Sequence, residues 1–111
     1  QSGVQIQQIG DYNTVNANLK ATEVKVSVNQ QGNNNELFLD KNAKTITQNI
    51  IQKGNDNAIS DFTLHTNYKV NTQMIQNGDN QNIKSIGTNS MSKNMKITQT
   101  GNGASLILIN K

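Results

Sequence analysis

The chain has 111 residues, enough for one domain and too few for two, and with 32% hydrophobic and 4% aromatic residues it is too polar to fill an ordinary globular core. Its 20 asparagines and 12 glutamines, at a charged content of only 15%, are typical of chains that stay disordered or stack amides in β ladders. The net charge of +3 comes from dispersed lysines without arginine, which argues against nucleic-acid binding, and the absence of cysteine and proline excludes disulfide frameworks and proline breaks in a stack.

At its start the chain reads Gln1-Ser2-Gly3, with no basic or apolar leader. We therefore expect a mature secreted chain whose signal peptide has been removed. No stretch has the length of a membrane span, so no membrane insertion is expected.

A Gln-x-Gly unit recurs five times, with glycines 22, 22, 24 and 23 residues apart, and divides the chain into repeats at about 1–23, 24–45, 46–69, 70–92 and 93–111. A unit of this length cannot bury its own apolar face. The repeats are therefore expected to stack as a parallel, amyloid-like two-sheet β-solenoid of strand, arc, strand, arc units, forming one domain over 1–111. Reading Asn77-Gly78 and Asn102-Gly103 as hairpin turns would instead give an antiparallel meander, but only two repeats carry the dipeptide.

Within the repeats, apolar residues alternate with polar ones, which predicts strands with one buried face. The first repeat alternates over 15–19, the second over 24–30, the third over 46–52 and the fourth over 70–76. In the third repeat the second strand carries Asp61 where the earlier repeats carry Ala17 and Leu39, and Phe62 and Leu64 suggest a shift by one residue, as in a β-bulge. Ser85 interrupts the fourth repeat in the same way, and the fifth is truncated.

Aligning the repeats on the glycine defines five columns that we expect to lie inside the solenoid or at its bends. The predicted glutamine ladder is Gln8, Gln30, Gln52, Gln76 and Gln99, followed by the glycine column Gly10, Gly32, Gly54, Gly78 and Gly101. An amide column holds Asn13, Asn35, Asn57 and Gln81, and ends at Ala104. The two apolar core columns are Ile6, Val28, Ile50, Met74 and Ile97, and Val15, Leu37, Ile59, Ile83 and Leu106. A buried glutamine is tolerable only when its amide bonds the repeats above and below.

Polar bends follow each glycine, as in Asp11-Tyr12-Asn13, Asn33-Asn34-Asn35 and Asn55-Asp56-Asn57. These residue types accept left-handed backbone and bond their own main chain. The glycines therefore have a conformational role, and no following helix or Lys-Ser/Thr pair suggests a phosphate site.

The pattern Gln-x-Gly-x-x-Asn-x-apolar, carried best by the first three repeats, resembles the curlin repeat of bacterial curli fibre subunits. The resemblance spans nearly the whole chain and implies secretion across the outer membrane, nucleated self-assembly, and an extracellular role in biofilm matrix and adhesion. Curlin repeats usually carry a second glutamine where this chain has Leu19, Lys41, Thr63, Gly87 and Asn110. A second amide ladder is therefore not expected.

A stack of this kind has an unpaired strand edge at each end, which favours a head-to-tail homopolymer. No cofactor is expected. We expect Met95–Leu108 of one subunit to dock on Val4–Leu19 of the next, while outward Lys25, Lys53, Lys84 and Lys96 slow lateral aggregation. The resemblance implies a nucleator subunit and secretion machinery as further partners.

Catalytic and metal sites are not expected. His65 is the only histidine and has no paired carboxylate, and the acidic residues are expected at bends or on outward positions. Asp56 and Asp79 follow the glycines, but a calcium β-roll has a much shorter period than these repeats.

The alternative to a structural fibre subunit is a soluble β-solenoid module that binds ice or carbohydrate. Ice binding calls for a regular outward Thr-x-Thr array, and Thr45-Ile46-Thr47 stands alone.

Overall fold

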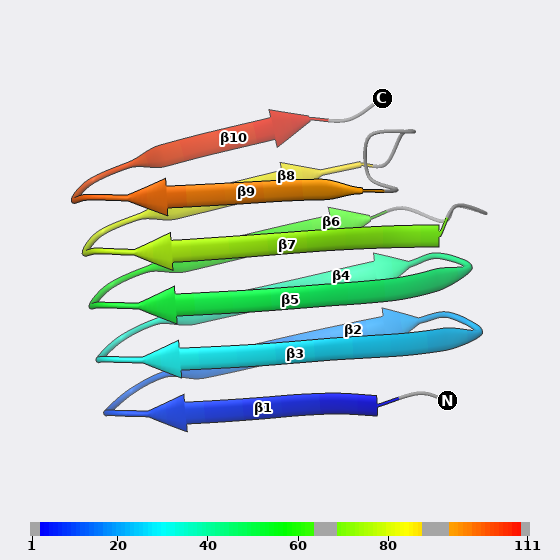
Figure 1. Cartoon of the computed structure of the whole chain (residues 1–111), viewed down its shortest axis with the longest axis horizontal. Coiled ribbons are helices and arrows are strands. Elements are labelled where there is room, and N and C mark those ends of the chain that lie inside the picture. Colours follow the sequence, from blue (N-terminus) through cyan, green and yellow to red (C-terminus); the bar gives the residue numbers. More distant parts are fainter. Residues whose placement is uncertain (1–2, 64–68, 88–93, 110–111) are drawn as a thin grey trace.

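The computed structural model describes residues 3–63, 69–87 and 94–109, which form ten strands in two five-stranded sheets (Figure 1). Sheet A holds β1 (Gly3–Ile9), β3 (Glu23–Gln31), β5 (Thr45–Lys53), β7 (Lys69–Asn77) and β9 (Met95–Thr100). Sheet B holds β2 (Thr14–Lys20), β4 (Glu36–Asn42), β6 (Ala58–Thr63), β8 (Asn82–Ile86) and β10 (Ser105–Ile109). None of these residues belongs to a helix that could cross a membrane.

All the strand pairs are parallel, and each joins a strand to its counterpart in the next repeat. The predicted two-sheet parallel β-solenoid is therefore confirmed, and the antiparallel meander is not formed. The glycine-based alignment matches the structural register, because Gln8 pairs with Gln30, Gln30 with Gln52, Gln52 with Gln76 and Gln76 with Gln99.

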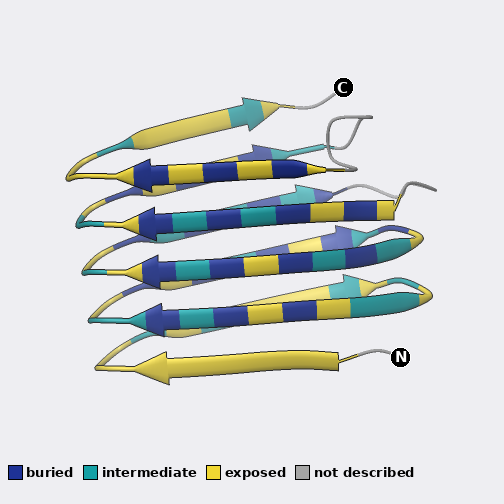
Figure 2. Ribbon diagram, in the orientation of Figure 1, coloured by how far each residue is buried: buried dark blue, intermediate teal, exposed yellow. Residues whose placement is uncertain are grey.

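The core lies between the two sheets, because inward residues of each strand face those of the opposite sheet. Leu39, Ile46, Ile50, Met74 and Ile83 have no exposed surface. Figure 2 shows the alternation of buried and exposed residues along β5, β7 and β9, and its loss in β1 at one end and β10 at the other. Each sheet covers the inner face of the other, whereas the strands of the first and last coils have no neighbouring strand on their outer side.

The two edges of the solenoid differ in how they join the sheets. At one edge, which we call the glycine edge, each connection from sheet A to sheet B has four residues. At the opposite edge the connections have two, two, five and eight residues. Backbone bonds join the coils at both edges, as in Gly32 N–H to Ile9 O at 3.0 Å at the glycine edge and Ala43 N–H to Lys20 O at 3.0 Å at the opposite edge, but only the glycine edge keeps one length in every coil.

The expected shift in the third repeat is wrong. β4 and β6 pair without a bulge from Glu36↔Ala58 to Lys41↔Thr63, so Asp61 takes the inward position that Leu39 has in the coil before. Phe62 points outward, and its ring lies 5.1 Å from that of Phe38. This ring contact accounts for an aromatic residue on the outer face. Leu64 lies outside the described residues.

Candidate functional site

The five ladder glutamines are joined by side-chain hydrogen bonds through the whole stack. The donor Nε2 and acceptor Oε1 are 2.8 Å apart from Gln8 to Gln30 and from Gln30 to Gln52, and 3.0 Å apart from Gln52 to Gln76 and from Gln76 to Gln99. The same Nε2 also donates to a sheet B carbonyl, as from Gln52 to Glu36 O at 2.9 Å. Each internal amide therefore links its coil to the next coil and to the facing sheet, which satisfies groups that are fully buried.

All four ladder bonds point the same way along the stack. Every Nε2 donates toward the C-terminal coil, and every Oε1 accepts from the N-terminal side. Within the described residues, Gln8 Oε1 accepts no hydrogen bond and Gln99 Nε2 donates only to Asn82 O, at 3.0 Å. One end of the stack thus presents an amide acceptor, and the other end presents an amide donor.

The amide column runs beside the glycine edge. Asn13 Oδ1 accepts from Asn35 N–H at 3.1 Å, and Asn13 Nδ2 donates to Gly32 O at 2.9 Å. The same pair of bonds links Asn35 to Asn57 and Gly54. Gln81 keeps the bond to Gly101 O at 2.8 Å, but its Oε1 is buried without a partner, because the extra methylene moves the carbonyl away from the column.

The glycine column is required by close coil-to-coil contact. A Cβ added at Gly10, Gly32 or Gly54 would lie 1.9 Å from the carbonyl oxygen of the next glycine, and all three have positive φ. At Gly101, in the last coil, a Cβ would meet nothing within 4 Å. The bend residue two positions on is also left-handed: Tyr12, Asn34, Asp56 and Asn80 have φ between 57° and 60°. Tyrosine is the only one of these types for which this conformation is distinctly unfavourable.

The end coils leave core-column residues uncovered. Val4 and Ile6 of β1 are 50% and 46% exposed, and Leu106 of β10 is 37% exposed. Their counterparts inside the stack, such as Val28 and Ile50, are 2% and 0% exposed. Of the predicted core columns, the structure buries the middle members and Ile97, leaves Val15 partly buried, and exposes the terminal members Ile6 and Leu106, which have a coil on one side only.

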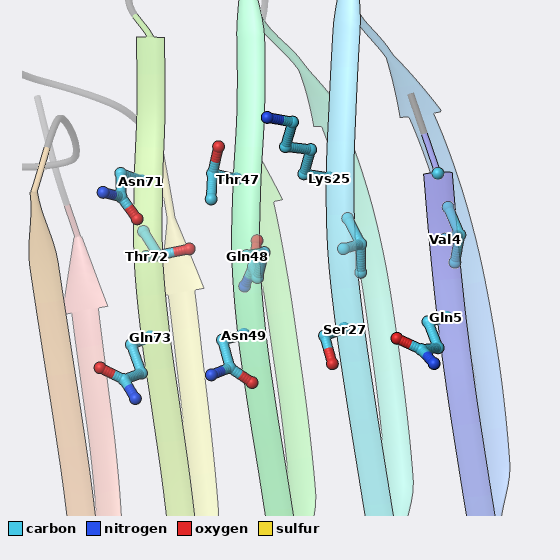
Figure 3. Close-up of a pocket in the computed structure, with 12 residues that line it drawn as sticks. Val4, Gln5, Lys25, Ser27, Thr47, Gln48, Asn49, Asn71, Thr72 and Gln73 are labelled. Carbon is cyan, nitrogen blue, oxygen red and sulfur yellow. The ribbon is translucent and has the colours of Figure 1, made fainter. Parts of the chain in front are cut away.

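The outer face of sheet A is hollowed into a trough of about 670 Å³ that crosses β1, β3, β5 and β7 (Figure 3). One wall carries Lys25, Thr47 and Asn71, and the other carries Gln5, Ser27, Asn49 and Gln73. The floor is the backbone of the column that lies between the two walls, and the side chains of this column point into the core. Its residues are Val4, Val26, Gln48 and Thr72. The trough therefore runs along the stack, perpendicular to the strands.

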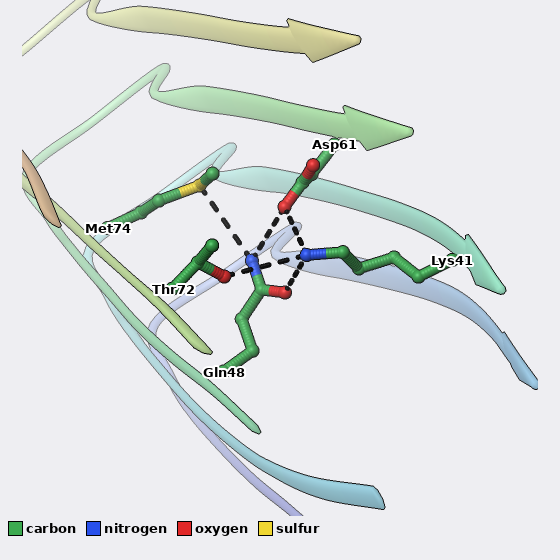
Figure 4. A network of polar contacts seen from close by, with 5 residues as sticks. All are labelled: Lys41, Gln48, Asp61, Thr72 and Met74. Carbon is green, nitrogen blue, oxygen red and sulfur yellow. Dashed lines mark hydrogen bonds and ion pairs between the residues drawn. The ribbon is translucent and has the colours of Figure 1, made fainter. Parts of the chain in front are cut away.

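A buried polar network interrupts the apolar core (Figure 4). Lys41 Nζ lies 2.8 Å from Asp61 Oδ2 and donates to Gln48 Oε1 at 2.6 Å, and Lys41 and Asp61 are only 1% and 2% exposed. Gln48 Nε2 donates to the same Asp61 oxygen at 2.8 Å. The expectation that all acidic residues lie at bends or on outward positions is therefore wrong for Asp61, which is held inside by an opposite charge.

This network was detectable in part, because Lys41, Gln48 and Asp61 occupy inward positions in the repeat alignment. Their opposite charges in adjacent coils were the available signal. Lys41 and Asp61 lie on the adjacent strands β4 and β6 of sheet B, whereas Gln48, on β5, belongs to sheet A, and the alignment of single strands does not show that these side chains meet. No cluster of three or more potential metal ligands occurs among the described residues, and His65 lies outside them.

The candidate site thus consists of stacked amides, a glycine spine, two open ends and a polar trough. Comparison of the chain with protein-family models, with curated proteins and with solved structures gave no match.

Proposed function

We propose that the chain is the structural subunit of an extracellular, curli-like fibre that grows by end-to-end stacking and serves in biofilm matrix and adhesion. The observation that carries the proposal is the complementarity of the two open ends. An acceptor amide and the exposed Val4 and Ile6 at one end would meet a donor amide and the exposed Leu106 at the other. A heterologous interface of this kind does not close and produces a filament.

Continuing the register by one coil places Gln99 over the next copy's Gln8, Ile97 over its Ile6 and Leu106 over its Val15. The junction would then gain one more amide bond in the same direction, and it would cover the exposed Val4, Ile6 and Leu106. Backbone pairing would add the edges of β1 and β2 to those of β9 and β10. A subunit in the opposite orientation would bring two amide acceptors or two donors together, which supports head-to-tail stacking.

The junction would lack one contact of the internal stack. Ala104 stands where the amide column needs an oxygen to accept the next copy's Asn13 N–H. An unmade bond of this type costs about 1–3 kcal/mol if the donor is buried. The junction would therefore be weaker than an internal coil contact, so that the subunit folds as a unit and assembles in a second step.

Secretion, a nucleating subunit and a dedicated export system are part of the proposal through the curlin resemblance. They rest on the repeat pattern Gln-x-Gly-x-x-Asn and not on contacts in the structure. A soluble carbohydrate-binding solenoid is the second candidate, favoured by the trough on sheet A.

The proposal is tested by incubating the purified chain, following thioflavin fluorescence and recording diffraction from aligned material. A meridional spacing of about 4.7–4.8 Å, with an equatorial one near 10 Å, is expected. A chain that stays folded and monodisperse at high concentration would overturn the fibre and leave the soluble binding module.

A matched pair of variants in β1 tests the junction itself. Ile6 lies in the core column and Ile9 in an outward column that already contains Lys53, and they are 46% and 52% exposed. Ile6→Lys would bury an unpaired ammonium at the junction, which costs several kcal/mol and raises the critical concentration for growth by roughly a hundredfold or more. Ile9→Lys is expected to grow like the parent. Equal growth of the two variants would show that β1 is not at the junction.

A further inference from the structure

The two outer faces of the solenoid differ in charge. The outward residues of sheet A include Lys25, Lys53, Lys69 and Lys96, all exposed, and among the described residues of these strands their only outward acid is Glu23. On sheet B, outward Lys20 and Lys84 are balanced by Glu36 and Asp40. The positive charge of the strands is therefore concentrated on the face that carries the trough.

Three of these lysines surround the trough. Lys25 forms part of its wall and is paired with Glu23 at 3.4 Å, in a contact that is largely exposed. Lys69 lies on β7 two residues before the wall residue Asn71, and Lys96 on β9 is the register partner of the wall residue Gln73. Lys53 lies away from the trough, near the bends that carry Asp56 and Asp79. Positive charge thus lies in one wall of the trough, beside that wall and at the β9 end.

The walls of the trough are lined with neutral hydrogen-bonding groups. Gln5, Asn49, Gln73 and Asn71 present amides, and Ser27 and Thr47 present hydroxyls, in rows that repeat once per strand, at about 4.8 Å (Figure 3). Amides and hydroxyls both donate and accept, so they match ligand hydroxyl groups, and lysine ammonium groups match carboxylates. A long ligand would have to be extended and lie along the stack.

We propose that this face binds an acidic polysaccharide, with the sugar hydroxyls on the amide and hydroxyl walls and the carboxylates on the flanking lysines. A polyanionic nucleic acid is the less suitable occupant, because the described outward residues of sheet A include no aromatic residue for base stacking and the chain has no arginine. The aromatic pair of Phe38 and Phe62 lies on the other sheet.

The inference deepens the proposed function by naming a matrix partner, but it does not require assembly, because four strands of one subunit build the whole trough. In a head-to-tail filament, the next copy's β1 would follow β9 and the trough would continue past the junction. One polysaccharide chain could then cross several subunits. Binding to a single subunit is the property to be measured.

The experiment measures the affinity of the folded chain, with its β-sheet content checked by circular dichroism, for a polyuronate oligosaccharide by calorimetry at low and at physiological salt. Dextran of the same length and a single-stranded DNA oligomer are the comparison ligands. Binding of polyuronate is expected to weaken with salt, as an exposed electrostatic contact does. Dextran is expected to bind more weakly, and DNA that binds as tightly as the polyuronate would overturn the assignment.

Two pairs of variants locate the site. Lys69→Gln with Lys96→Gln is expected to weaken polyuronate binding by roughly two- to thirtyfold at low salt, whereas Lys20→Gln with Lys84→Gln removes the same charge from sheet B and should change it less than about twofold. Ser27→Tyr fills the trough without changing charge and should abolish binding, whereas Ser60→Tyr on sheet B should not. Binding that survives Ser27→Tyr, or that falls equally in both lysine pairs, would refute the trough as the site. Polyuronate binding by a chain that never forms fibres would refute the proposed function and leave this inference standing.

Discussion

Replacing Asp61 with alanine should be among the most destabilising single changes in the chain. Asp61 is the only carboxylate among the described residues within ion-pair distance of Lys41, whose ammonium is buried at 1% exposure. After the change, Lys41 Nζ would keep Gln48 Oε1 at 2.6 Å and Thr72 Oγ1 at 3.5 Å, both uncharged. Removing one member of a buried pair costs about 3–5 kcal/mol, against a total stability of about 5–15 kcal/mol for a domain.

The same reasoning predicts that removing the whole network restores stability. The coil before each residue holds an apolar side chain in the same column: Leu19 precedes Lys41, Val26 precedes Gln48 and Leu39 precedes Asp61. The triple variant Lys41→Leu, Gln48→Val, Asp61→Leu therefore copies side chains that the fold already accepts. We expect it to be as stable as the parent or more stable, because apolar replacements of buried ion pairs are often neutral or better.

Equilibrium urea unfolding followed by circular dichroism measures both variants, at a concentration where light scattering shows a monomer. With a slope of about 2 kcal/mol per molar urea, a loss of about 4 kcal/mol lowers the midpoint by about 2 M. Asp61→Asn, which keeps the shape and one acceptor, should fall between parent and alanine variant. A midpoint for Asp61→Ala within about 0.5 M of the parent would refute the buried pair. A triple variant as unstable as Asp61→Ala would refute the compensation.

Three further changes test the spine and its bends. Gly101→Ala should lower the stability of the monomer only modestly, through its φ of 92°, because its Cβ meets no atom of the subunit within 4 Å, whereas Gly54→Ala should lose the fold. Gly101→Ala should stop elongation, because its Cβ would meet the next copy's Gly10 carbonyl as closely as the 1.9 Å contact found inside the stack. Normal elongation of a folded Gly101→Ala variant, checked by circular dichroism, would argue against glycine-edge stacking. Gln81→Asn should raise the free energy of unfolding by about 1 kcal/mol, by returning the buried, unpartnered carbonyl to the column, and an unchanged urea midpoint would contradict this. Tyr12→Asn should stabilise by about 1 kcal/mol in thermal unfolding, because asparagine accepts φ 60° more readily, and a lower melting temperature would indicate a contact of the tyrosine ring.

The repeat-level fold could be predicted from the sequence because every repeat uses the same chemistry at the same place. Gln30 and Gln52 are equivalent in sequence and in space, so one alignment gives the register of the coils and the inward positions. Glycine at the bend is visible for the same reason. In the middle coils, the alternation of apolar and polar residues shows directly which residues face the core.

The features that could not be predicted are those in which one repeat differs from its neighbours. Asp61 was expected to shift its strand because a carboxylate is costly in an apolar core. The register is kept because Lys41, one coil earlier on the neighbouring strand of the same sheet, supplies the compensating charge. The trough on sheet A could not be predicted, because it depends on the side chains of two outward columns over four strands. The direction of the amide ladder is likewise set by geometry, since glutamine carries a donor and an acceptor that sequence cannot orient.

The unequal edges of the solenoid make it a scaffold on which peptides can be displayed. The glycine edge accepts no change of length, because each of its connections has four residues locked to the coils on either side, whereas the opposite edge already joins its strands with two to eight residues. A peptide inserted between Asn42 and Thr45, where the connection has two residues, would leave every ladder residue in place. Repeated along a filament, such insertions would form a single row on one side, one per subunit, spaced by five strand separations of about 4.8 Å each.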